Sequence, residues 1–156
     1  MRIPSGRVTF LFKIDAVDTR TTPDGVSIIK MSFTTSDKKT RVARFSVRRL
    51  ADGFAAVAVS HIEAEATSRE GTSTDVRMVV GNTYRVVVDY DLRAPAAGKP
   101  MVEVTVDGRK AATVDGENEG IRQLDPEVRI FFGVASENLG MTAFFDDFVL
   151  TGDVVR

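Results

Sequence analysis

Hydrophobic and polar residues alternate along most of this chain. The pattern is clearest near the N-terminus, where Val8, Phe10, Phe12 and Ile14 alternate with polar side chains such as Lys13. Because successive side chains of a strand point to opposite faces, this period of two predicts a half-buried β-strand. Similar patterns predict further strands at Val26–Thr34, Arg41–Arg49, Phe54–Ile62, Asp75–Val80, Thr83–Asp91, Met101–Val106, Arg109–Val114, Val128–Val134 and Thr142–Leu150.

Turn-forming residues separate these predicted strands. Asp107-Gly108 indicates a tight hairpin, because Asp-Gly supplies the positive φ angles of a type I′ turn. The stretch Ala55–Arg69 is rich in Ala and Glu, but Val57 and Val59 alternate within it, so we predict a strand followed by a loop. Short strands with turns between them and no convincing helix predict an all-β fold, a two-sheet antiparallel jelly-roll sandwich.

Composition narrows the classes of function. A length of 156 residues fits one domain, spanning residues 1–156. The 21 Lys and Arg nearly balance the 22 Asp and Glu, so we expect no partner among nucleic acids or membranes. The absence of cysteine excludes disulfides, thiolate zinc sites and cysteine nucleophiles. The chain contains neither a signal-peptide pattern nor an apolar stretch long enough to span a membrane, and its compartment is left open.

Four short motifs in a fixed order carry a resemblance to a known family. They are the strand Gly81–Tyr90, the "VDG" hairpin Val104–Gly108, the glycine-containing strand Ile130–Val134 and the closing "FDD" strand Phe145–Leu150. In this order, residues 80–152 resemble the laminin-G-like branch of the concanavalin A-like jelly rolls. The resemblance implies a recognition module that binds a glycan or a protein partner. Tyr84 stands where that family often carries Trp, and the chain has no Trp, which weakens the case for sugar stacking.

Two adjacent acids, Asp146 and Asp147, interrupt the last predicted strand. In a regular strand they point to opposite faces and cannot form the acid pair that flanks a glycosidic bond. We favour a structural role, in which one of them accepts backbone N–H bonds or sits at a β-bulge. Calcium, bound by these acids or by Asp89 and Asp91, is the weaker alternative, and no other cofactor is expected.

Arg44 and Arg48 are the candidate ligand-binding residues. They share one face of a predicted strand, where guanidinium groups can grip sulfate, phosphate or carboxylate through bidentate hydrogen bonds. The alternative is a charged face that only interacts with solvent. The single histidine, His61, has no triad spacing around it, and we predict a solvent-exposed position at a strand end.

The motif search favours a non-enzyme. No nucleotide-binding loop, zinc-protease motif or serine-hydrolase motif occurs. The Glu-x-Asp-x-x-Glu motif of laminarinase-type glycosidases is also absent, since Glu63, Glu65 and Glu70 have a different spacing. We therefore expect a non-catalytic module that binds a glycan or a protein. The alternatives are a structural or assembly protein that forms homo-oligomers through strand edges or sheet faces, and, least favoured, a glycosidase without the recognisable motif.

Overall fold

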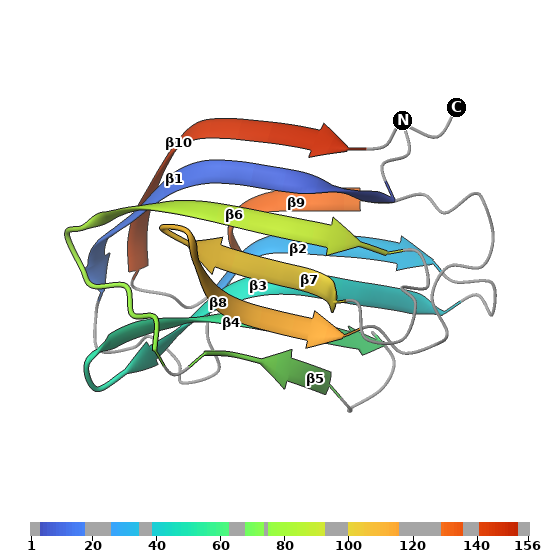
Figure 1. Cartoon of the computed structure of the whole chain (residues 1–156), viewed down its shortest axis with the longest axis horizontal. Coiled ribbons are helices and arrows are strands. Elements are labelled where there is room, and N and C mark those ends of the chain that lie inside the picture. The colour runs from blue at the N-terminus through green and yellow to red at the C-terminus, as the bar shows by residue number, and fades with distance from the viewer. Residues whose placement is uncertain are drawn as a thin grey trace.

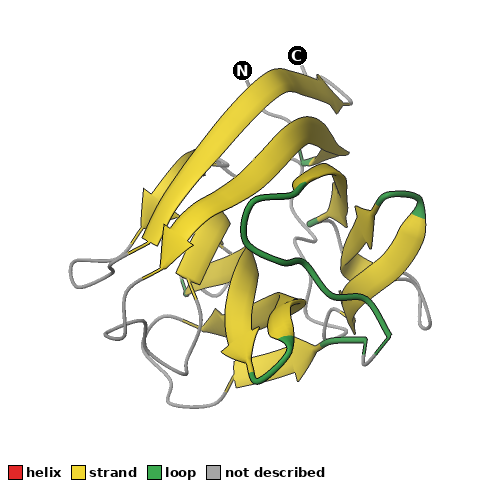
Figure 2. Cartoon of the chain, turned by 90° about the vertical axis from the view of Figure 1, so that its left-hand side faces the viewer, coloured by secondary structure: helices red, strands yellow, loops and turns green. Residues whose placement is uncertain are grey.

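Two five-stranded antiparallel sheets pack face to face (Figure 1). The computed structural model describes residues 4–17, 26–34, 39–62, 68–73, 75–92, 100–115, 129–135 and 141–152. Within these ranges, the residues outside strands form loops and turns, and no helix is present that could cross a membrane (Figure 2). The predicted two-sheet jelly-roll sandwich is confirmed.

The two sheets are named here by their place in Figure 1. The front sheet has the strand order β10-β1-β6-β7-β8 and the back sheet the order β5-β4-β3-β2-β9. The front strands are β1 (Ser5–Val17), β6 (Thr83–Asp91), β7 (Pro100–Val106), β8 (Arg109–Asp115) and β10 (Met141–Gly152). The back strands are β2 (Val26–Thr34), β3 (Thr40–Leu50), β4 (Gly53–Ile62), β5 (Ser68–Gly71) and β9 (Arg129–Ala135).

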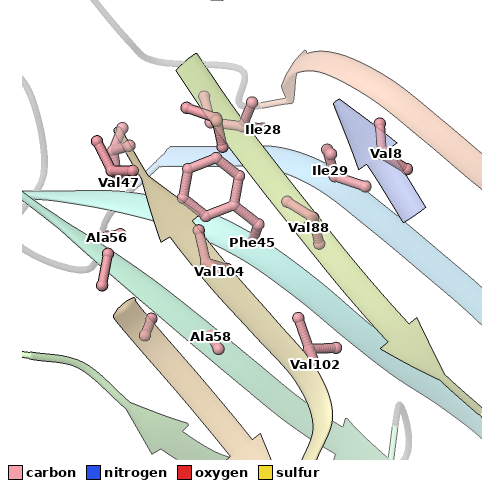
Figure 3. Packing of buried hydrophobic residues seen from close by; sticks show 14 of the residues in the cluster. Val8, Ile28, Ile29, Phe45, Val47, Ala56, Ala58, Val88, Val102 and Val104 are labelled. Atoms are coloured by element: carbon pink, nitrogen blue, oxygen red, sulfur yellow. The ribbon is translucent and has the colours of Figure 1, made fainter. Parts of the chain in front are cut away.

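The hydrophobic core lies between the sheets because each sheet turns one apolar face inward. The alternating residues Val8, Phe10, Phe12 and Ile14 of β1 are fully buried, as predicted. The ring centroid of Phe10 lies 6.4 Å from that of Phe45 on the opposite sheet. Figure 3 shows Phe45 among the side chains of both sheets that fill this space. This packing fixes which residues of each strand face outward.

The predicted hairpin between β7 and β8 is confirmed. Asp107 and Gly108 have φ angles of 47° and 77°, both in the left-handed region. A type I′ turn requires positive φ at both central residues, and Asp and Gly tolerate it.

The segment Asp75–Val80 is not the strand that its alternation predicted. It forms one isolated bridge, in which Phe54 and Met78 exchange backbone hydrogen bonds of 2.7 and 2.8 Å. A few residues later, the Gly81 N–H donates to the Ile14 carbonyl of the front sheet at 2.8 Å. The segment crosses from one sheet to the other, so its buried residues, Val76 and Met78, reach the core without a ladder.

The short strand β5 was not predicted, because its three polar residues and one glycine carry no alternation. It closes one side of the sandwich by approaching β8 closely. A Cβ atom added to Gly71 would lie 1.6 Å from the Thr113 carbonyl oxygen, so only glycine fits there. The nearby Ser73 N–H donates to the Ala111 carbonyl at 2.8 Å. This contact holds β5, and with it Glu70, at the edge of the back sheet.

Candidate functional site

The outer face of the back sheet gathers positive charge. On β3, Ala43 and Phe45 belong to the core, so Arg44 and Arg48 point outward on one face, as predicted. Lys30 of β2 lies directly opposite Arg44, and therefore shares that face. We call this surface the cationic face; its basic residues are Lys30, Arg44, Arg48, His61 and Arg129.

Two rows of cross-strand neighbours cross this face from β9 to β5. The first row consists of Phe131, Lys30, Arg44, Val59 and Glu70. The second row consists of Arg129, Ser32, Val42, His61 and Ser68. Adjacent strands lie about 4.8 Å apart, so side chains within a row are direct neighbours. His61 is a diagonal neighbour of Arg44, about 7–8 Å away by the usual sheet geometry.

Arg44 is the central residue of the cationic face. Its Nε atom is buried and donates no hydrogen bond, and its side chain makes no ion pair in the described part of the chain. Buried polar atoms are nearly always hydrogen-bonded in native proteins, and the exceptions call for an explanation. A guanidinium group in this state is ready to receive an anion with paired oxygens.

An apolar floor lies between these charges. Val42, Val57 and Val59 are each only 1% exposed, although they lie outside the core, on the same face as Arg44. Charges beside low-dielectric surroundings are screened less than charges in open water. An anion bound at Arg44 would therefore feel a stronger attraction than one at an open surface.

Arg48 is already paired. Its Nη2 atom lies 2.6 Å from Oε2 of Glu70, across the sheet on β5. Their side chains are 29% and 37% exposed, so the pair borders solvent. Arg48 is therefore placed at the margin of the site, while Arg44 occupies its middle.

The four aspartates named as calcium candidates do not come together. Asp89 forms a bidentate ion pair with Arg7, at 2.6 Å to Nε and 3.0 Å to Nη2. The hydrogen bond to Asp89, followed by the attraction of its charge, raises the pKa of Arg7. Asp146 lies opposite Leu11, several residues along β1 from Arg7. No group of three or more possible metal ligands occurs among the described residues.

A β-bulge follows Asp146 in β10 and consists of Asp147 and Phe148, opposite Phe10. Thr9 pairs with Val149 and Leu11 with Asp146, which leaves two residues of β10 opposite one of β1. Asp147 has a φ of 52°, and its N–H donates to Oδ1 of Asp146 at 2.8 Å. Regular alternation, assumed from the sequence, is wrong here because the extra residue shifts the faces. Phe145 and Leu150 consequently both pack against the core.

Three residues of this face were missed or misjudged from the sequence. His61 is half-buried beside Arg44 and was predicted to be solvent-exposed. Lys30 and Phe131 were not singled out at all. The alternation around Lys30, between Ile29 and Met31, indicated an outward lysine. The pairing register that brings it to Arg44 has no signal within one strand.

The fold is similar to those of two solved alginate lyases. The enzyme from Klebsiella pneumoniae shares 14% identity with a TM-score of 0.57, over 97% of this chain and 61% of that one. A variant of the alginate lyase Aly36B, solved in complex with an alginate trisaccharide, shares 11% identity with a TM-score of 0.62, over 97% of this chain and 71% of that one. No family model and no curated protein matches the chain.

These similarities correct the functional expectation. The chain was predicted to be a non-catalytic recognition module, with an assembly protein as the alternative. That prediction is contradicted, because the two solved structures reported above are alginate lyases, which are enzymes. At these identities the likeness establishes the fold class, a jelly-roll β-sandwich, and the chemistry must be argued from the cationic face itself.

Proposed function

We propose that this protein is a polysaccharide lyase that binds an anionic, uronate-containing polysaccharide on its cationic face. The observation that carries the proposal is Arg44, a guanidinium group with a buried, unpaired Nε in the middle of that face. The fold shared with alginate lyases supports the same class of substrate. A uronate supplies what the site needs, a carboxylate on every sugar ring.

Arg44 is the residue we assign to the substrate carboxylate. A bidentate guanidinium–carboxylate pair fixes the orientation of the ring and neutralises its charge. Neutralisation is needed because removing the proton next to the carboxylate, at C5, places further negative charge on that group. Stabilising this developing charge in a preorganised site is the largest usual contribution to such catalysis.

His61 is the residue we assign to proton removal. It lies diagonally across β3 and β4 from Arg44, within reach of the carbon that bears the bound carboxylate. Imidazole is the side chain best suited to exchange protons near neutral pH. When the base removes the C5 proton, the electron pair is first delocalised onto the carboxylate. It then forms the C4–C5 double bond as the C4–O bond breaks, and the departing oxygen takes a proton from water.

The tyrosines do not compete for this role. The sequence contains two, Tyr84 and Tyr90, and both lie on β6 of the front sheet. Tyr84 packs against the core, and its hydroxyl accepts a hydrogen bond from the Val79 N–H at 2.8 Å. Tyr90 is buried. Glu70, an acid at the margin of the same face, is paired with Arg48, so we assign the role of base to His61.

The experiment is a cleavage assay on purified protein. The protein would be incubated with polyuronates and with neutral polysaccharides as controls. Elimination leaves an unsaturated uronate at each new chain end, whose ultraviolet absorbance reports cleavage directly. We expect a rise in absorbance with polyuronate alone, and no rise with any polyuronate would contradict the proposal.

Two variants and one control assign the roles. His61→Ala should abolish cleavage and retain binding, while Arg44→Ala should weaken both. Losing a charge-assisted hydrogen bond costs about 1.5–3 kcal/mol, or roughly 10- to 100-fold in affinity. The matched control is Arg85→Ala, since Arg85 is an exposed arginine on the outer face of the front sheet. Equal loss in Arg85→Ala and Arg44→Ala would show that only general charge matters.

Two finer assignments belong to the same proposal. We place the chain in the concanavalin A-like class of jelly rolls, with residues 1–156 forming one domain. The order of the quoted motifs supports this, as does the hairpin turn at Asp107 and Gly108. The chain spans 61% of the length of the Klebsiella pneumoniae enzyme, so its substrate range is part of the proposal.

A further inference from the structure

Phe131 is a large apolar side chain that the core does not use. It lies on β9, the edge strand of the back sheet, and is 54% exposed. Its neighbours in sequence face the other way: Ile130 packs against the core, and the Phe132 ring lies 5.1 Å from that of Phe10. Phe131 therefore points outward onto the cationic face.

The position of Phe131 relates it to the proposed binding residues. It lies directly opposite Lys30, which lies directly opposite Arg44. With strands about 4.8 Å apart, Phe131 and Arg44 are separated by about 10 Å, so one chain that spans more than two sugar rings can contact both. A single exposed phenylalanine needs no explanation by itself. The alignment of Phe131 with Lys30 and Arg44 in one row does need an explanation.

We infer that Phe131 is a stacking platform for a pyranose ring of the bound uronate chain. This inference rests on the proposed function and adds a residue that selects the substrate by shape as well as charge. The C–H face of a pyranose ring is apolar, and packing it on an aromatic ring removes both surfaces from water. The carboxylates of the stacked ring and its neighbour then lie toward Lys30 and Arg44.

Phe144 shows that exposure alone does not make such a platform. It lies opposite Lys13 on the front sheet and is 56% exposed, which makes it a close match to Phe131. Its ring is already approached by the Lys13 ammonium, 5.8 Å from the centroid. Lys13 is also paired with Asp15 at 3.1 Å. Phe144 therefore already has a cationic neighbour on its own sheet, whereas the row that contains Phe131 leads to the unpaired Nε of Arg44.

The test measures binding in a background that does not cleave. Calorimetry with uronate oligosaccharides would compare His61→Ala with the double variants that add Phe131→Ala, Phe131→Tyr or Phe144→Ala. An aromatic contact contributes about 0.5–1.5 kcal/mol, so Phe131→Ala should weaken binding by up to about tenfold. Phe131→Tyr keeps the ring and should bind normally, as should Phe144→Ala. Saturation-transfer NMR should show contact to the sugar C–H protons, which Phe131→Ala removes.

The outcomes separate this inference from the proposed function. Unchanged affinity and NMR contacts in Phe131→Ala, with binding still lost in Arg44→Ala, would overturn the platform alone. Equal weakening by Phe131→Ala and Phe144→Ala would overturn it as well, because a non-specific loss would then explain both. Absence of uronate binding by the unaltered protein would overturn the proposed function and the platform together.

Discussion

The two outer faces of the sandwich look alike in sequence and differ in charge. Both carry charged residues at positions that alternate with core residues. On the front sheet, Arg7 pairs with Asp89 and Lys110 with Glu103, so positive and negative charges cancel locally. On the back sheet, Arg44 lies beside Lys30 and makes no ion pair in the described part of the chain, while Arg48 pairs with Glu70 at the margin.

This difference teaches that pairing identifies a binding face better than charge does. An exposed ion pair contributes little stability. However, it leaves neither partner available to bind a charged ligand. A row of like charges is unfavourable in the unbound protein and favourable once an anion lies on it. The chain as a whole is nearly neutral, so this contrast is invisible in its net charge.

Charge reversal should give the largest effect. Arg44→Glu replaces an attractive contact with a repulsive one, and we expect polyuronate affinity to fall by at least about 100-fold. Arg85→Glu makes the same change on the front sheet and should leave affinity nearly unaltered. Binding would be measured by calorimetry, after circular dichroism has shown that both variants are folded. A similar loss of polyuronate affinity in the two variants would show that the two faces do not differ in binding.

A pH scan separates stability from binding. Burial raises the pKa of Tyr90 to about 12, above its ordinary value of about 10. The neutral phenol is favoured in the folded state, so its contribution is complete below pH 10 and is lost as pH rises through 12. We expect the midpoint of chemical unfolding to fall over that range. In Tyr90→Phe the unfolding midpoint should fall less over this pH range. If it falls as much as in the unaltered protein, another group causes the loss of stability.

Removal of the acid at the margin should strengthen binding modestly. Glu70→Gln releases Arg48 from its ion pair and removes a negative charge from the end of the first row. Exposed pairs are worth about 0.2–1 kcal/mol, so polyuronate affinity should rise by about two- to fivefold. Glu103→Gln breaks a pair on the front sheet and serves as the matched control. Weaker binding by Glu70→Gln would show that Glu70 contacts the substrate itself.

The smallest effect is expected at the Arg7–Asp89 pair. The Arg7 side chain is 60% exposed, so solvent screens the interaction despite its bidentate geometry. A double-mutant cycle with Arg7→Ala and Asp89→Ala should give a coupling free energy below about 1 kcal/mol. The cycle would be measured by urea unfolding. A much larger coupling would mean that the front face is stabilised by its charges.

The fold and part of the site could be predicted from the sequence. Alternation within β1 identified its buried residues, and Asp107-Gly108 identified the hairpin, because both signals are local. The same local rule placed Arg44 and Arg48 on one face. These predictions require only the period of a strand and the chemistry of a turn.

The remainder depends on pairings between distant segments. Nothing within β2 or β9 indicates that Lys30 lies between Arg44 and Phe131, because register is set by packing across the whole sheet. The enzyme class that we propose was missed for the same reason. Catalytic motifs were sought as spacings along the chain, whereas Arg44 and His61 are diagonal neighbours on two adjacent strands. The proposed lyase site therefore has no signature within a single segment of the sequence.

The bulge at Asp147 changes which residues of the final strand face the core. Before it, the inward residues have odd numbers, such as Phe145; after it they have even numbers, such as Leu150. The length of β10 is therefore constrained more tightly than its composition. Losing or gaining one residue between Phe145 and Leu150 would turn every later side chain to the opposite face, whereas many substitutions there would leave these faces unchanged.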